Sequence, residues 1–171
     1  YTLLVAALVS LLFTSCGDTK NETPDNFDYN VTQFEDIKIL RYQIPSWDNL
    51  TLKEQKLVYY LTQAGLEGRD IIWDQNYRHN LAIRKSFEQI YTTYQGDKES
   101  QDWANFEVYM KRVWFANGIH HHYSNAKMKP AFSADYLQSL LTDTGATLTS
   151  DAFAVLFNDK DAKKAVSYTH L

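Results

Sequence analysis

The sequence predicts a mainly α-helical protein in which a short extended segment precedes the first helix. Two patterns support this fold class after residue 50: apolar side chains recur at helical spacing, and helix-capping residues stand at the ends of these stretches. Trp, Tyr and Phe make up 15% of the 171 residues, which favours a packed core over a disordered chain.

The extended segment covers residues 34–45, where apolar and polar side chains alternate imperfectly until Pro45 ends the run. Thr51 then offers an N-cap oxygen, and Glu54 stands three residues later, which is the pattern of a capping box. The helix that follows carries a stripe of small and apolar residues on one face: Leu57, Leu61, Ala64, Gly65 and Gly68. We expect this face to pack closely against another helix.

Further helices are predicted along the rest of the chain. A second helical stretch covers residues 69–94 with a break at 76–80, a third covers 102–116, a fourth begins at Ser133, and a short fifth covers 150–157. Gly96, Gly118 and Gly145 follow the second, third and fourth of these. The side chains expected to face the core are Ile83, Phe87, Ile90, Tyr94, Trp103, Phe106, Met110, Val113, Trp114, Tyr136, Leu137, Leu140 and Leu141.

The N-terminal region has the pattern of an export signal. The apolar segment 2–13 is shorter than the roughly 20 residues of a membrane-spanning helix. It leads to Cys16, the only cysteine, in a run that resembles the lipobox of bacterial lipoproteins. We expect residues 1–15 to be a signal peptide and Cys16 to be lipidated, which would anchor an exported chain to a membrane of the bacterial cell envelope. The alternative is a short buried helix with a free thiol.

The remaining organisation follows from composition. Residues 16–30 are polar and are predicted to form a flexible tether, residues 31–165 to form one helical domain, and residues 166–171 resemble translated adapter sequence rather than native protein. The chain does not open with Met, which favours a truncated gene product. A formal net charge of −4 without a basic stripe argues against nucleic acid as a partner.

The densest cluster of candidate functional side chains comes between the third and fourth predicted helices: Asn117, His120, His121, His122 and Tyr123. Consecutive histidines cannot converge on one ion from a helix or from a strand, so the cluster is a weak candidate for a zinc site. It fits either a polar loop packed against Trp114 and Tyr123 or a loop that contacts substrate. No complete active site is recognisable from the residues alone.

Three segments resemble the N-terminal part of the dipeptidyl-peptidase III family as found in Bacteroides-type bacteria. They are residues 50–76 (LTLKEQKLVYYLTQAGLEGRDIIWDQN), 112–124 (RVWFANGIHHHYS) and 129–133 (KPAFS). The resemblance extends over residues 33–141 in order and at matching spacing. It implies a two-lobed zinc metallopeptidase that releases dipeptides from the N-terminus of oligopeptides bound in the cleft between its lobes.

The resemblance also places the metal outside this segment. The zinc of the family lies in a His-Glu-x-x-Gly-His helix with a further Glu downstream, both in the later lobe, and neither motif occurs here. It therefore implies no catalytic or metal-binding residue in this chain, which would be inactive without the C-terminal part of the peptidase. The substrate-binding residues expected at the cleft wall are Asn117, His120, His121, His122 and Tyr123. The alternative is a lipid-anchored helical module that binds peptides or other ligands without catalysis.

Overall fold

The computed structural model describes residues 27–164 and divides the chain into two compact units, one up to residue 45 and one from residue 46 onward. The predicted signal peptide, Cys16, most of the predicted tether and the tail 166–171 lie outside the described residues. Within residues 27–164, no helix is both long enough and apolar enough to cross a membrane.

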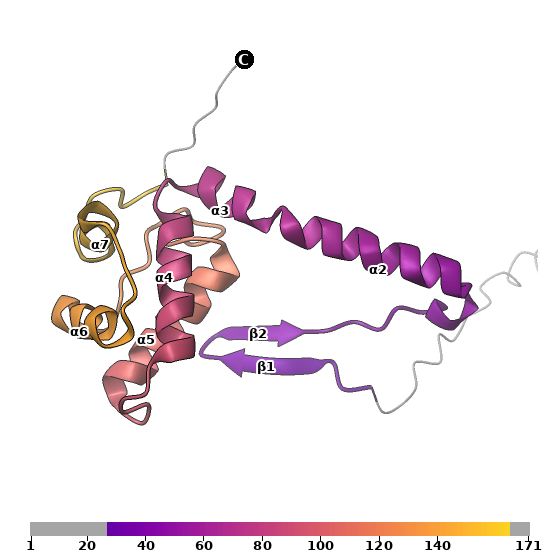
Figure 1. The fold of residues 1–171 in the computed structure, drawn as a ribbon, viewed down its shortest axis with the longest axis horizontal. Helices are drawn as coiled ribbons and strands as arrows, with labels where there is room; N and C mark the ends of the chain where they lie inside the picture. Colours follow the sequence, from indigo (N-terminus) through magenta and orange to yellow (C-terminus); the bar gives the residue numbers. More distant parts are fainter. Residues whose placement is uncertain (1–26, 165–171) are drawn as a thin grey trace, which may run out of the picture. The chain divides into compact units, whose positions relative to one another are not determined.

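The first unit contains an antiparallel hairpin of β1 (Asn30–Phe34) and β2 (Ile37–Leu40), seen in Figure 1. Phe34 pairs with Ile37 across the turn, where Glu35 adopts a positive φ of 47°. The extended segment predicted before the first helix is therefore confirmed. The first strand was missed, because its sequence NVTQF is mostly polar and begins at the last residue of the predicted tether.

The second unit begins with a 3-10 turn (Trp47–Asn49) and the helix α2 (Leu52–Glu67). The predicted capping box is confirmed: the backbone N–H of Thr51 donates to the Glu54 carboxylate at 2.8 Å, and the Glu54 N–H donates to the Thr51 hydroxyl. The predicted packing of α2 is wrong for the described chain. No α2 side chain is buried, Leu57 and Leu61 are 58% and 63% exposed, and no other helix approaches within 4 Å of a Cβ placed on Gly65.

The other helices follow the sequence pattern closely. They are α3 (Arg69–Asn76), α4 (Asn80–Thr93), α5 (Gln101–Ala116), α6 (Ala134–Thr144) and α7 (Ser150–Phe157). The hydroxyls of Ser100, Ser133 and Thr149 cap the N-termini of α5, α6 and α7 by accepting a backbone N–H each. The break between α3 and α4 lies at residues 77–79, within the predicted interval.

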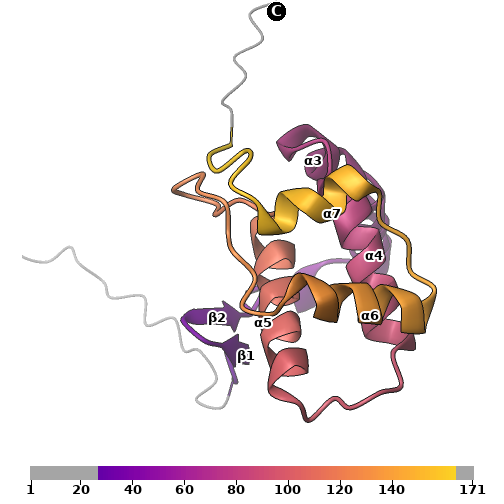
Figure 2. The same ribbon diagram turned by 90° about the vertical axis from the view of Figure 1, so that its left-hand side faces the viewer.

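The core lies among α3 to α7, where α4 contacts α3, α5 and α6. Figure 2 shows α6 and α7 side by side across α4 and α5. Aromatic rings join the layers, because Phe87 of α4 contacts Phe106 of α5 and Phe106 contacts Phe132 in the segment before α6. Ten of the predicted core side chains are buried, and Tyr94, Trp114 and Tyr136 are half-buried against them.

Candidate functional site

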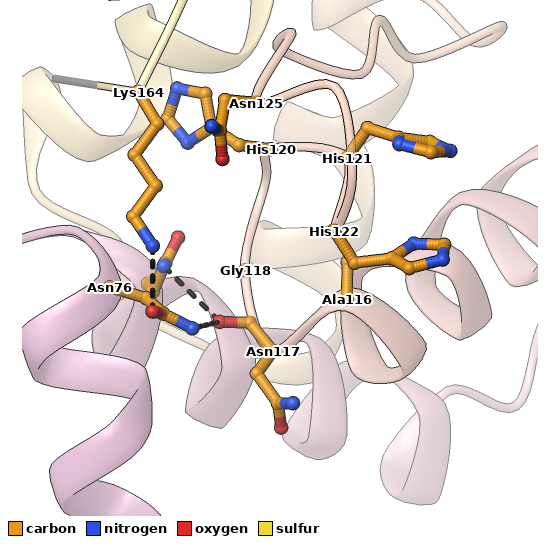
Figure 3. A pocket seen from close by; sticks show the side chains of 10 residues that line it. Asn76, Ala116, Asn117, Gly118, His120, His121, His122, Asn125 and Lys164 are labelled. Atoms are coloured by element: carbon orange, nitrogen blue, oxygen red, sulfur yellow. Dashed lines mark hydrogen bonds between the residues drawn. The ribbon is translucent and has the colours of Figure 1, made fainter. Parts of the chain in front are cut away.

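A polar cavity of about 210 Å³ lies where the C-terminal ends of α3 and α5 meet the loop after α5 and the last described residue. Figure 3 shows the residues that line it. They are Asn76, Asn80, Ala116, Asn117, Gly118, His120, His121, His122, Asn125 and Lys164. The cavity therefore combines amides, imidazoles and one ammonium group, and none of the described side chains that line it is acidic.

The loop leaves α5 through a turn that Asn80 holds in place. Asn117 ends the helix in the left-handed conformation, and Gly118 follows with a φ of +153°, where a Cβ would overlap the Asn80 side-chain amide. Asn80 is 1% exposed, and its amide accepts the N–H of Ile119 at 3.1 Å while donating to the Asn117 carbonyl at 3.4 Å. One buried amide at the start of α4 thus fixes the first turn of the loop.

A chain of side-chain hydrogen bonds continues from this turn to the far end of the described sequence. The Asn76 amide donates to the same Asn117 carbonyl at 3.2 Å, and the ammonium group of Lys164 donates to the Asn76 oxygen at 2.7 Å. Figure 3 shows these bonds as dashed lines, with the Asn117 side chain pointing away from Asn76 and Lys164. Asn117 therefore contributes its backbone carbonyl, rather than its amide, to this network.

His120 is a buried histidine, 5% exposed, between the loop and the C-terminal segment. Its Nε2 lies 2.8 Å from the carbonyl oxygen of Asp161, so Nε2 carries the proton and donates it to that oxygen. The buried Nδ1 has no hydrogen-bond partner among the described residues. Burial lowers the pKa of His120 and the positive charge of Lys164 adds to this effect, while the bond to Asp161 opposes it. The imidazole is thus held neutral.

The other two histidines have different surroundings. His121 Nδ1 accepts the backbone N–H groups of Tyr123 and Ser124 at 3.2 Å, which closes a local turn. The His122 ring is exposed, stacks on His121 at 4.5 Å between ring centroids, and meets the ring of Phe115 edge-on. Figure 3 shows the rings of His121 and His122 pointing to one side of the loop and the ring of His120 lying near Lys164.

The structure does not bring the three rings together as a metal site. The rings of His121 and His122 point to one side of the loop, and the ring of His120 lies near Lys164. Within residues 27–164, no group of three or more His, Cys, Asp or Glu side chains is placed to hold a metal. The described residues that line the cavity offer amides, imidazoles and one ammonium group.

Lys127 ties the loop to the end of α7. It is a buried lysine, and its ammonium group donates to the backbone carbonyls of Val155 at 2.8 Å, Lys160 at 2.7 Å and Asn158. Its backbone N–H donates to the carbonyl of Ala162. Burial lowers the pKa of Lys127. The ammonium group sits where the carbonyls at a helix C-terminus lack partners inside the helix.

Four of the five residues predicted at the site line the cavity, namely Asn117, His120, His121 and His122. Tyr123 does not: its ring lies against His122, and the residue is 85% exposed. Sequence reasoning missed Asn76, Asn80, Asn125 and Lys164 as lining residues, and Lys127 as the residue that holds the loop. One local signal pointed to Asn80: Asn117-Gly118 stands at a helix end, and the backbone N–H and carbonyl groups of such a turn need hydrogen-bond partners from a neighbouring side chain.

Comparisons with protein-family models and with curated protein sequences give no match to this chain.

Proposed function

We propose that this chain forms the metal-free, substrate-contacting part of a zinc dipeptidyl peptidase of the dipeptidyl-peptidase III type, which releases dipeptides from the N-terminus of oligopeptides. The observation that carries the proposal is the cavity beside the loop 117–125. It brings together His120, Lys164 and Asn125, and its floor is fixed by the buried Asn80. Sites that hold a peptide in one orientation need polar groups fixed in this way.

The role that the described residues support is binding and orientation. A peptide main chain offers alternating N–H donors and carbonyl acceptors, which amide and imidazole side chains can match. The part in the reaction that we propose for these residues is to hold the peptide in place. In the proposed enzyme, zinc would lower the pKa of a bound water and polarise the scissile carbonyl, from a part of the polypeptide outside the described residues.

The exposed apolar side chains of α2 and α3 support the proposal that a further part of the peptidase is the partner. Nine large apolar side chains of these helices are 41–67% exposed: Leu52, Leu57, Val58, Tyr59, Tyr60, Leu61, Leu66, Ile71 and Ile72. Monomeric soluble proteins rarely expose so many large apolar side chains close together, because removing apolar surface from water is favourable. Packing against the remaining C-terminal part of the enzyme would remove this surface from water.

The proposed location is a bacterial cell envelope, with the chain exported and anchored through lipid on Cys16. The apolar segment 2–13 and the lipobox-like run that ends at Cys16 support it. Labelling of the expressed chain with a radioactive fatty acid tests the proposal. Label that is present in the wild type and absent from Cys16→Ser supports the anchor, and equal labelling of both excludes it.

A lipid-anchored module that binds peptides without cleaving them is the second candidate. It is favoured by the core of the second unit, which joins buried side chains from α3 to α7 without any contribution from α2. Such a core is what an autonomous binding domain requires.

Peptide hydrolysis separates the two candidates. We expect the 171-residue chain, supplied with one equivalent of zinc, to bind oligopeptides and to release no dipeptide from them. A longer product whose reading frame continues past residue 165 and contains His-Glu-x-x-Gly-His should release dipeptides. Release by the 171-residue chain itself, or a stop codon directly after residue 165 in the gene, would overturn the peptidase proposal.

A further inference from the structure

The cavity beside the loop carries a charge that no described residue neutralises by direct contact. Lys164 is the one charged side chain among the described residues that line it, and its hydrogen bond is to the neutral amide of Asn76. The carboxylate of Asp161, which lies near His120, accepts the hydroxyl of Tyr77 instead. An ammonium group has three donors, and two of those of Lys164 make no hydrogen bond within residues 27–164.

Both ends of the Lys164 side chain are held in place. Its backbone N–H donates to the Asn125 carbonyl at 2.8 Å, next to the bridge between Ala126 and Lys163, and its ammonium group is fixed by Asn76. A lysine held in this way loses less rotamer freedom when it meets a ligand than a free surface lysine does.

Neighbouring groups add donors but no negative charge. The side-chain amide of Asn125 lines the cavity and makes no hydrogen bond within the described residues. His120 is neutral, and its Nε2–H donates to the backbone carbonyl oxygen of Asp161. Among the described residues that line the cavity, a ligand group that enters therefore meets one cation and an amide donor, and no carboxylate competes with it.

We propose that this cavity binds a carboxylate group of a peptide, with the Lys164 ammonium group as the charged donor and the Asn125 amide as a second donor. A carboxylate has only acceptor atoms, so it can use both donors, and its bond to an ammonium group is charge-assisted. Phosphate is a poorer match, because the lining residues within 27–164 include one cation. The inference deepens the proposed function and rests on it, because it takes the ligand to be a peptide.

Lys164 also lies at the C-terminal end of α3, where a positive charge stabilises the helix dipole. A loss of stability on its removal would therefore say nothing about binding. The experiment must read the preference for a carboxylate directly, by comparing ligands that differ in that group alone.

The test measures dissociation constants of the full 171-residue chain for tetra-alanine with a free C-terminal carboxylate and for tetra-alanine amide, by NMR shift titration at low ionic strength. We expect the acid to bind roughly tenfold or more tightly than the amide, which is the size of one charge-assisted hydrogen bond. Lys164→Met should remove this preference, and Lys164→Arg, which keeps the charge, should retain most of it.

Lys163→Met is the matched control, because it removes the same charge from the neighbouring exposed residue, which does not line the cavity. The inference is overturned if the wild type binds acid and amide equally, if Lys164→Met keeps the preference, or if Lys163→Met loses it to the same extent. An amide-capped peptide with one aspartate shows whether the carboxylate comes from a side chain or from the C-terminus.

Acetate separates failure of this inference from failure of the proposed function. Equal, Lys164-independent binding of acid and amide would exclude the carboxylate site and leave peptide binding in place. Lys164-dependent binding of acetate, with no peptide bound more tightly than acetate, would support a carboxylate site and count against peptide as the ligand. Binding of none of the probes would overturn both.

Discussion

Lys127 holds the loop to the end of α7 more firmly than the neighbouring ion pair of Lys129 does. Each N–H bond of its ammonium group has a carbonyl acceptor, and the three acceptors all come from the end of α7 and the residues after it. Lys129, two residues later, forms an ion pair with Asp159, but both side chains are largely exposed. Exposed pairs contribute little to stability, whereas breaking a buried set of hydrogen bonds leaves polar groups without partners.

We therefore predict that Lys127→Met lowers the free energy of unfolding by roughly 2 kcal/mol, since one buried and two part-buried carbonyls lose their donor. Lys129→Met is the matched control and should change it by less than about 0.5 kcal/mol. Urea denaturation followed by circular dichroism measures both. Similar small effects of the two substitutions would show that the Lys127 bonds do not hold the loop in solution.

The burial of His120 predicts that the stability of the protein falls at acidic pH. Because burial lowers its pKa, the folded protein resists protonation below the ordinary value of 6.5, while the unfolded chain accepts the proton. The contribution of the neutral His120 to stability is then fully present above pH 6.5. It falls as the pH drops through 6.5 toward the lower folded-state pKa, by no more than about 1.4 kcal/mol per pH unit for one proton.

Urea midpoints at pH 7.5 and 5.5 measure this effect, and His120→Gln should reduce it. Asp159 and Asp161 do not interfere with this measurement. Hydrogen bonds from Lys129 and Tyr77 lower their pKa values from 3.8, so their contribution to stability is lost only as the pH falls below that value. A wild-type midpoint that is flat between pH 7.5 and 5.5 would show that His120 is not buried as described.

The residues of the site divide into those that local sequence could predict and those that it could not. The loop and three of its histidines were predicted from their density in one connection. Lys164 and Asn76 are 88 residues apart and Lys127 bonds carbonyls about 30 residues away, so no periodicity or cap signal connects them. Tyr123 was expected with the histidines at the cleft wall, but the turn closed by His121 leaves its ring outside the cavity.

At the level of elements, α2 and α6 are both capped, amphipathic helices, and their burial differs completely. Leu140 of α6 is fully buried, whereas Leu61 of α2 is 63% exposed. We predict that Leu140→Ala lowers the free energy of unfolding by about 2–5 kcal/mol and that Leu61→Ala changes it by less than about 0.5 kcal/mol. Chemical denaturation measures both, and a cost for Leu61→Ala as large as that for Leu140→Ala would show that α2 is packed in the isolated chain.

Helix boundaries were predictable because caps act locally. Thr51 and Glu54, Ser133 and Gly145 each satisfy backbone groups within a few residues, so their identity and spacing determine where a helix begins or ends. The burial of a helix face depends instead on what lies opposite. The stripe of α2 has the same spacing as that of α4, yet only the stripe of α4 meets partners within the described residues.

At the level of the whole molecule, the chain combines a small net charge with many exposed apolar side chains on α2 and α3. A formal charge of −4 over 171 residues gives weak electrostatic repulsion between copies. The nine exposed apolar side chains of α2 and α3 favour contact with any surface that removes them from water. Without its proposed partner, the chain should therefore associate with itself or precipitate.

We predict that the chain sediments as concentration-dependent oligomers and that Leu57→Glu combined with Leu61→Glu shifts it toward monomer, because two charges on the exposed face of α2 oppose its burial. Gln63→Glu is the matched control, since it adds a charge to the same helix without removing apolar surface. All the variants keep the apolar segment 2–13, so a difference between them isolates the contribution of α2. Sedimentation velocity at several concentrations measures the outcome. A wild type that is monomeric throughout, with a cooperative thermal transition, would show that the chain needs no partner for α2 and would count against its being part of a larger enzyme.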